Sequence, residues 1–295
     1  MLMVEGLTKK FPNGRGIEDI SFEAKQGEAF GFLGPNGAGK STTIRLIMGF
    51  MKPDRGHVTI DGLEARRHPE AVMKKVGYLP GEISFPEGMS GRAFLDFLAS
   101  MQRAESRTKR DRLIERLQFD ADTPIRKMSK GMKQKVGLVA ALMHDPALVI
   151  LDEPTTGLDP LMQKTFVELV LEEKKKGTTF LMSSHSFPEM ERTCDRAAII
   201  KNGRLAAVKD IHELRSLQRK LFELVFDDAE DALSFSRSGI GEAAVEGNRV
   251  IVAVQGGDDA LIRAASRYSI RSIDIAAQNL EDVFMHYYDR KEIAP

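Results

Sequence analysis

The chain has 295 residues, enough for one large domain and one small domain. Lysine plus arginine and aspartate plus glutamate both number 43, so the formal net charge is zero and no general electrostatic attraction to nucleic acid is expected. Cys194 is the only cysteine, which excludes an intrachain disulfide and suits a reducing compartment. We expect neither a signal peptide nor a membrane-spanning helix, because the longest apolar runs fall well short of about 18–20 residues.

Short apolar strands alternate with helices from the N-terminus to about residue 217, which predicts an α/β fold with helices packed on a sheet. The first clear unit is the apolar run Ala29–Leu33, a buried strand, followed by a loop and a helix with periodic apolar residues. The loop matches the phosphate-binding pattern of a glycine, four residues and Gly-Lys-Ser, and it consists of Gly34, Pro35, Asn36, Gly37, Ala38, Gly39, Lys40 and Ser41.

The residues of this loop suit the phosphates of a nucleotide. Glycines let backbone N–H groups turn inward around an anion, and the N-terminus of the following helix adds its positive end. Lys40 supplies a mobile positive charge, Ser41 supplies a hydroxyl ligand for Mg²⁺, and Thr42 continues the binding segment. The alternative is a glycine-rich turn of purely structural use. The strand before the loop and the helix after it favour the nucleotide-binding interpretation.

We expect a helical subdomain at about residues 83–145. Ser90 is placed to cap a helix at Ala93–Met101, and a second helix follows near Ser106–Leu117. The second helix is rich in arginine and lysine. Two interpretations stay open for it: a solvated helix face, or a docking face for a partner.

The composition changes after about residue 217. Asn202-Gly203, between two apolar runs, predicts a β-hairpin that closes the first domain. Residues 218–295 then read as strand, helix, two strands, helix and strand, followed by a last helix at Leu280–Tyr288. This βαββαβ order predicts a small α+β accessory domain of the ferredoxin-like type. We find no catalytic cluster in it and expect a regulatory or dimer-supporting role.

A second chemical motif follows the phosphate-binding loop by about 112 residues. The buried strand Leu148–Leu151 ends in Asp152 and Glu153. Asp152 is placed to hold Mg²⁺, directly or through water, as the acidic partner in phosphate-loop NTPases. Glu153, immediately after it, can polarise an attacking water as general base. A strand followed by an acidic turn would carry little meaning alone, but its pairing with the loop favours a nucleotide site.

Further motifs occur in an order that resembles the ATP-binding cassette (ABC) ATPase family over roughly Leu2 to Val208. Met128–Met132 is similar to the Leu-Ser-Gly-Gly-Gln signature at its serine, Ser129, and at its second glycine, Gly131. Thr156–Asp159 resembles the family's D-loop, and Ser183-Ser184-His185 resembles the segment that carries its switch histidine. Leu7–Phe11 resembles the adenine-stacking segment. The fold class that this implies is a P-loop NTPase of the ABC ATPase type with a helical subdomain.

The resemblance assigns roles that the residues alone do not. Cassettes of this family dimerise head to tail, so that each ATP lies between one subunit's phosphate-binding loop and the other's signature. Phe11 would then stack on adenine, and Ser129 and Gly131 would contact the γ-phosphate of the nucleotide held by the partner. His185 would contact the γ-phosphate and help to orient the lytic water. The implied cofactors are ATP and Mg²⁺.

The chain departs from the family pattern at three positions. Lys130 replaces the first signature glycine and Met132 replaces the signature glutamine, while the serine and the second glycine remain. After Val76–Pro80 the family usually places a glutamine that reaches Mg²⁺ and the attacking water, whereas this chain has Gly81 and then Glu82. We therefore consider Glu82 as a substitute metal ligand.

The resemblance implies an ATP-hydrolysing subunit that powers a separate membrane permease and lies peripherally on the cytoplasmic face of the cell membrane. Tyr78–Glu82 and Leu280–Phe284 resemble segments of drug- and lipid-exporter ATPases, which favours export over import. One rival is a soluble ABC protein of translation or DNA repair. A single phosphate-binding loop and the short spacing to the acid pair argue against it. The other rival is a regulatory or resistance module that binds ATP but hydrolyses little.

Overall fold

The computed structural model describes residues 1–86, 88–102, 107–211, 213, 220–254 and 258–275. The chain divides into two compact units, residues 1–211 and 212–295, which are described separately. The expected helix at Leu280–Tyr288 and the exporter-like segment Leu280–Phe284 lie outside the described residues. Within the described parts, every helix is too short or too polar to cross a bilayer.

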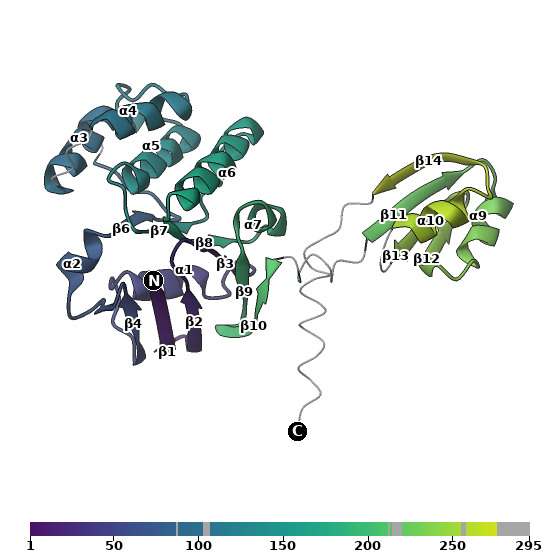
Figure 1. Cartoon of the computed structure of the whole chain (residues 1–295), viewed down its shortest axis with the longest axis horizontal. Helices are drawn as coiled ribbons and strands as arrows, with labels where there is room; N and C mark the ends of the chain where they lie inside the picture. Colours follow the sequence, from purple (N-terminus) through teal and green to yellow (C-terminus); the bar gives the residue numbers. More distant parts are fainter. Residues whose placement is uncertain (87, 103–106, 212, 214–219, 255–257, 276–295) are drawn as a thin grey trace. The chain divides into compact units, whose positions relative to one another are not determined.

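The first unit contains an antiparallel sheet with the strand order β2-β1-β4-β5 (Figure 1). Its strands are β1 (Leu2–Lys10), β2 (Gly16–Ala24), β4 (Arg55–Ile60) and β5 (Leu63–Glu64). Burial alternates along β2, as expected for a strand with one face in the core. The buried face carries aliphatic side chains such as Val4 and Ile20.

A second sheet of six strands has the order β10-β9-β3-β8-β7-β6. Its strands are β3 (Ala29–Leu33), β6 (Val76–Leu79), β7 (Leu148–Asp152), β8 (Thr179–Ser184), β9 (Arg196–Lys201) and β10 (Arg204–Asp210). All pairs from β9 to β6 are parallel, and β3, β7 and β8 are buried along their whole length. Parallel strands end at one edge of a sheet, so the segments after β3, β7 and β8 meet there.

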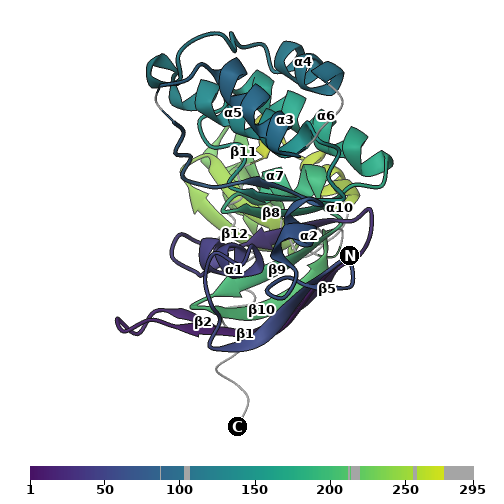
Figure 2. The same ribbon diagram turned by 90° about the vertical axis from the view of Figure 1, so that its left-hand side faces the viewer.

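Helix α1 (Lys40–Ile47) lies between the two sheets (Figure 2). Its apolar residues Ile44 and Ile47 belong to one core cluster with Val4 of the first sheet and Phe30 and Ile150 of the second. The other helices of this part of the unit are short or lie on the parallel sheet: α2 (Pro69–Met73), α6 (Pro160–Lys175) and α7 (Phe187–Thr193). The shared core therefore fixes the start of α1 near the edge of the sheet where the parallel strands end.

The helical subdomain consists of α3 (Gly91–Gln102), α4 (Arg107–Arg116), the 3-10 turn η1 (Ile125–Lys127) and α5 (Lys130–Leu142). Both views place these helices at one end of the unit (Figure 1, Figure 2). Ser90 accepts a hydrogen bond from Ala93 N at 3.2 Å, which confirms the expected helix start. Some basic side chains of α4 form ion pairs with acidic residues of α6: Lys109 pairs with Glu173 at 2.7 Å, and Arg116 pairs with Glu172.

Strands β9 and β10 form the predicted hairpin, with Asn202 and Gly203 both at positive φ, 46° and 76°. The second unit contains β11 (Lys220–Phe226), α9 (Ala229–Ser236), β12 (Gly241–Glu246), β13 (Arg249–Val254), α10 (Asp258–Ala265) and β14 (Ile270–Ile275). Its antiparallel sheet has the order β12-β13-β11-β14, with a separate core around Leu224, Phe226 and Phe235. The βαββαβ order matches the expectation from the sequence.

Candidate functional site

The glycine-rich loop joins β3 to the first turn of α1, as the sequence predicts. Gly37 and Gly39 adopt φ values of 81° and 113°, which favour glycine because a side chain would be strained there. Gly39 caps α1 without a side-chain hydrogen bond, so the first N–H groups of the helix stay available to an anion. Ala38 is 4% exposed and packs into the core below the loop.

Lys40 is held inside the loop that contains it. Its ammonium group donates to the carbonyl of Gly34 at 2.7 Å and to that of Pro35 at 3.3 Å, and its side chain is 5% exposed. The same group lies 3.3 Å from Glu153 Oε1. A buried ammonium needs such acceptors, because an unpaired buried charge is costly. The ammonium group of Lys40 is therefore held at the loop, where its positive charge can bind an anionic ligand.

A hollow of about 440 Å³ opens over this loop. Its walls include Asn36, Ser41 and Thr42 from the loop and helix start, with Phe11 from the segment after β1 and Glu153 from the segment after β7. The structure thus brings the expected aromatic residue and the expected general base to the same space as the phosphate-binding loop. The volume and the mixed aromatic and charged lining suit a nucleotide.

Glu153 lies between two cationic or polar groups at the edge of the sheet. Its Oε1 faces Lys40, and its Oε2 lies 2.7 Å from Nδ1 of His185, which follows β8. The backbone of Glu153 has a φ of 53°, an uncommon value for this residue type. Its N–H donates to Ser183 Oγ at 3.0 Å. The two predicted catalytic residues are therefore in direct contact.

A neighbouring hollow of about 260 Å³ gathers oxygen atoms suited to a divalent cation. Ser41, Glu82, Asp152 and Glu153 line it. Asp152 is 3% exposed, and one of its oxygens accepts a hydrogen bond from Ser183 Oγ. The described residues contain no group of three or more histidine, cysteine, aspartate or glutamate side chains of the kind that holds a metal alone. Mg²⁺ suits such a site, because it uses one or two carboxylates together with phosphate oxygens and water.

The predicted signature begins α5. Ser129 is the N-cap, and its hydroxyl accepts from Met132 N at 3.2 Å. Gly131 lies against the loop after β7, where an added Cβ would come within 2.6 Å of the carbonyl of Gly157. Neither Ser129 nor Gly131 lines the two hollows described above. The signature of this chain therefore does not border the hollow over its own phosphate-binding loop.

Comparisons with known proteins agree with this geometry. Residues 17–156 match the family model for ABC transporters. A linearmycin resistance ATP-binding protein of Bacillus subtilis is 36% identical over 213 residues, which are 70% of this chain and 68% of the relative. The chain belongs to the ABC transporter family.

Other relatives and solved structures extend this result. A Nod factor export ATP-binding protein of Mesorhizobium japonicum is 30% identical over 97% of this chain and 86% of its own length. A bacitracin transport ATP-binding protein of Bacillus licheniformis is 33% identical over 77% of this chain and 75% of its own length. A solved ATP-binding subunit of an ABC transporter has a TM-score of 0.67 and 34% identity, and covers 73% of this chain and 92% of that one. This chain is an ATP-binding cassette of an ABC transporter and an ATPase.

Three features of the cassette's site were not predicted from the sequence. Arg45, on the second turn of α1, lines both hollows. Ser183, in β8 and two residues before His185, contacts both Asp152 and the backbone of Glu153. Burial together with the charge of Asp152 raises the pKa of Tyr78 to about 12. Of these three, only the position of Arg45 could have been predicted from the sequence, because it is one helical turn beyond Ser41 on the same helix.

Proposed function

We propose that this cassette hydrolyses Mg²⁺-bound ATP between two head-to-tail copies, or between this copy and a similar cassette, and thereby powers a separate membrane permease. The observation that carries the proposal is the position of Glu153 between Lys40 and His185, at the edge of the hollow over the phosphate-binding loop. A carboxylate there can accept a proton from water beside the terminal phosphate.

The loop and its neighbours would hold the nucleotide. Phe11 would stack on adenine, and backbone N–H groups of the loop with Lys40 would bind the phosphates. The phosphate-binding set is Gly34, Pro35, Asn36, Gly37, Ala38, Gly39, Lys40, Ser41 and Thr42. Ser41 and Asp152, with Glu82 as a third candidate, would hold Mg²⁺, which neutralises charge on the phosphate oxygens.

The reaction needs groups from both copies. Glu153 would act as general base, and His185 would contact the γ-phosphate and keep Glu153 and the water in place. Ser129 and Gly131 would offer a hydroxyl and an N–H group to the nucleotide of the partner copy, since both lie at the start of α5. Neither residue lines this chain's own hollows, which supports a contact in trans.

We also propose export as the direction of transport. The relatives named for resistance, bacitracin transport and Nod factor export support this, as does the exporter-like segment Tyr78–Glu82. The permease would be another chain, and the cassette would lie peripherally on the cytoplasmic side of the cell membrane. Residues 1–217 would be the ATP-binding domain, and residues 218–295 an accessory domain with a regulatory or dimer-supporting role.

Turnover of the purified chain tests the proposal. ATP hydrolysis should depend on Mg²⁺ and should increase when membranes with the cognate permease are added. Lys40→Ala should lower both ATP affinity and turnover, because the phosphate charge loses its partner. Lys52→Ala, an exposed lysine in the segment after α1, is the matched control and should behave as the parent chain. Normal turnover in Lys40→Ala would contradict the assignment of the loop. ATP binding with negligible turnover under all conditions would favour the regulatory module.

A further inference from the structure

Two loops bring Glu153 and His185 together, and both leave neighbouring strands. Strands β7 and β8 are parallel, with Asp152 opposite Ser183. Glu153 follows the end of β7, and His185 follows the end of β8. One backbone hydrogen bond extends this pairing past Asp152, from Glu153 N to the carbonyl of Ser183 at 3.2 Å, but it places only the backbone of Glu153. The distance between the two side chains therefore depends on contacts made beyond the sheet.

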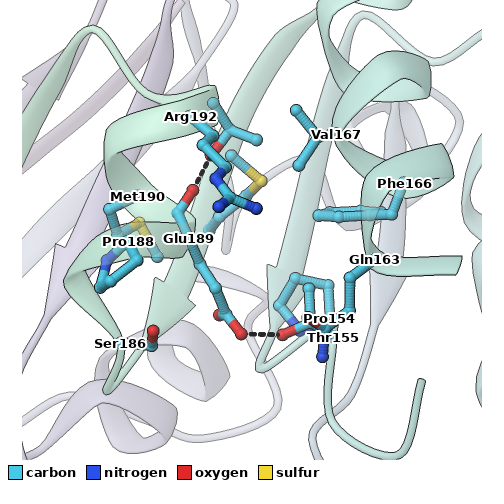
Figure 3. Close-up of a pocket in the computed structure, with 12 residues that line it drawn as sticks. Pro154, Thr155, Gln163, Phe166, Val167, Ser186, Pro188, Glu189, Met190 and Arg192 are labelled. Atoms are coloured by element: carbon cyan, nitrogen blue, oxygen red, sulfur yellow. Dashed lines mark hydrogen bonds between the residues drawn. The ribbon is translucent and has the colours of Figure 1, made fainter. Parts of the chain in front are cut away.

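Such a contact is made by Glu189, on the first turn of α7. One carboxylate oxygen of Glu189 accepts a hydrogen bond from Thr155 Oγ1 at 2.5 Å, and the other accepts one from Ser184 Oγ at 2.7 Å. Thr155 is two residues after Glu153, and Ser184 directly precedes His185. Figure 3 shows Glu189 extending from α7 to Thr155. A single carboxylate thus connects the loop after β7 with the last residue of β8, and Glu189 does not line the nucleotide hollow.

These contacts are well placed to hold the loops. Thr155 is 6% exposed and Ser184 is 1% exposed, so water competes little for either hydroxyl. Hydrogen bonds from hydroxyls to an ionised carboxylate are short and stronger than those between neutral groups. The carbonyl of Glu189 also accepts from Thr193 Oγ1 at 2.9 Å, which ties this residue to the far end of α7. Ser184 Oγ accepts from Ser186 N at 2.8 Å, which fixes the start of the turn into α7.

We propose that Glu189 is a positioning residue for ATP hydrolysis, which sets the spacing of Glu153 and His185 through Thr155 and Ser184. The proposal rests on the proposed function of Glu153 and His185. Glu153 Oε2 contacts His185 Nδ1 directly. Glu189 adds a second connection between the same two segments, because it accepts hydrogen bonds from Thr155 and Ser184. Glu189 itself lines neither nucleotide hollow and does not touch the substrate space.

The surroundings of Glu189 make it suitable for substitution. It borders a separate hollow of about 200 Å³ between α6 and α7, which Phe166, Val167 and Arg192 also line (Figure 3). Shortening Glu189 would enlarge this open hollow rather than leave an enclosed cavity in the core, so the variant should fold. Arg192 is exposed, lines the same hollow and stands one turn further along α7. Arg192→Ala is therefore the matched control.

The first experiment measures turnover and ATP affinity separately. Glu189→Ala should lower kcat by about 10- to 100-fold, the range expected when a reacting group is displaced by about 1 Å. Its Kd for ATP should stay within about twofold of the parent value, because Lys40 and the loop are intact. Glu189→Gln keeps a side chain that bonds both hydroxyls and should recover most of the loss. Arg192→Ala should match the parent chain. A folded Glu189→Ala with parental kcat would overturn the proposal.

A mutant cycle tests the route of the effect. Thr155→Val and Ser184→Ala each remove one hydroxyl, and the double variant should lose as much kcat as Glu189→Ala. Adding Glu189→Ala to that double variant should cause no further loss, because the carboxylate acts only through these two groups. If the losses in kcat multiply instead, Glu189 acts by another route and the proposal is wrong.

A readout without turnover separates this proposal from the function on which it rests. The NMR signal of the His185 imidazole, assigned by its absence in His185→Gln, reports the contact with Glu153. Glu189→Ala should move this signal toward its position in Glu153→Gln, and Arg192→Ala should leave it in place. An unmoved signal would overturn the positioning role. Absent turnover in the parent chain would contradict the proposed function, while the NMR comparison would still decide the role of Glu189.

Discussion

Glu153→Gln should separate the proposed general-base role of this side chain from its contact with Lys40. The amide has nearly the same size as the carboxylate, but it carries no charge, so it can neither take up a proton from water at neutral pH nor form an ion pair with Lys40. In the structure, Glu153 Oε1 lies 3.3 Å from the ammonium of Lys40 and Glu153 Oε2 lies 2.7 Å from His185. The substitution therefore removes the proposed general base and also releases Lys40 from a competing anion.

The two effects differ in size and in sign. Loss of a general base lowers a rate by about 10²- to 10⁴-fold, so kcat should fall within that range. ATP affinity should rise, because the phosphates no longer displace Glu153 from Lys40. Lys40 is 5% exposed and Glu153 is 20% exposed, so the ion pair is partly open to water and contributes about 1 kcal/mol. That figure corresponds to about fivefold tighter ATP binding.

Titration with ATP at protein concentrations too low for dimerisation measures the affinity, and phosphate release measures the rate. Glu115→Gln, an exposed glutamate on α4, is the matched control for both assays. At micromolar protein with saturating ATP and Mg²⁺, Glu153→Gln should accumulate an ATP-bound dimer. Parental turnover would refute the role of Glu153 as base. Affinity weakened tenfold would refute the competition between Glu153 and the phosphates for Lys40.

Four further outcomes follow from the site and the core. Phe11→Ala should weaken ATP binding by about 5- to 150-fold, the equivalent of about 1–3 kcal/mol of stacking, and an unchanged Kd would place adenine elsewhere. Ser129→Glu should prevent the ATP-bound dimer, measured by size-exclusion chromatography, while ATP binding by the monomer stays nearly intact; weakened monomer binding would contradict a role in trans. Glu82→Ala should reduce turnover at limiting Mg²⁺ and stimulation by the permease, and parental values of both would exclude Glu82 from the site. Burial raises the pKa of the Cys194 thiol to about 12, and that of Tyr78 is also about 12. Because the folded chain then keeps protons that the unfolded chain releases above about pH 9, the free energy of unfolding should fall as pH rises from 9 to 12; a urea midpoint equal at pH 7 and pH 10.5 would contradict this.

Local patterns were sufficient to predict many elements of the fold. Ser90 caps its helix as expected, because an N-cap is decided by residues within one turn. Asn202-Gly203 forms its hairpin because positive φ at both positions is a local requirement. The order of strands in the parallel sheet was not predictable in this way. It depends on which buried strands pack beside β3, and their apolar sequences do not distinguish the partners.

In the candidate site, too, locally determined positions were predictable and tertiary contacts were not. Motif spacing placed Lys40, Ser41 and Asp152 in the site, because each stands at the end of a strand or the start of a helix whose position the sheet fixes. The bridge from Glu189 to Thr155 and Ser184 could not be predicted, since it joins side chains that are 34 and 5 residues apart and depends on the packing of α7. Ion pairs between α4 and α6 are also tertiary contacts without a sequence signal.

Gly81 illustrates how a departure from the family pattern acquires a physical meaning. An added Cβ at this position would lie 3.2 Å from Asp152 Oδ2, closer than most real Cβ contacts, so the backbone here passes directly beside the expected metal ligand. A glutamine at position 81 would require the loop or Asp152 to shift. Glu82, the next residue, instead lines the hollow with Ser41 and Asp152. Because a carboxylate and a glutamine amide both offer an oxygen to Mg²⁺, the proposed metal site keeps an oxygen donor in its lining, one residue further along the chain.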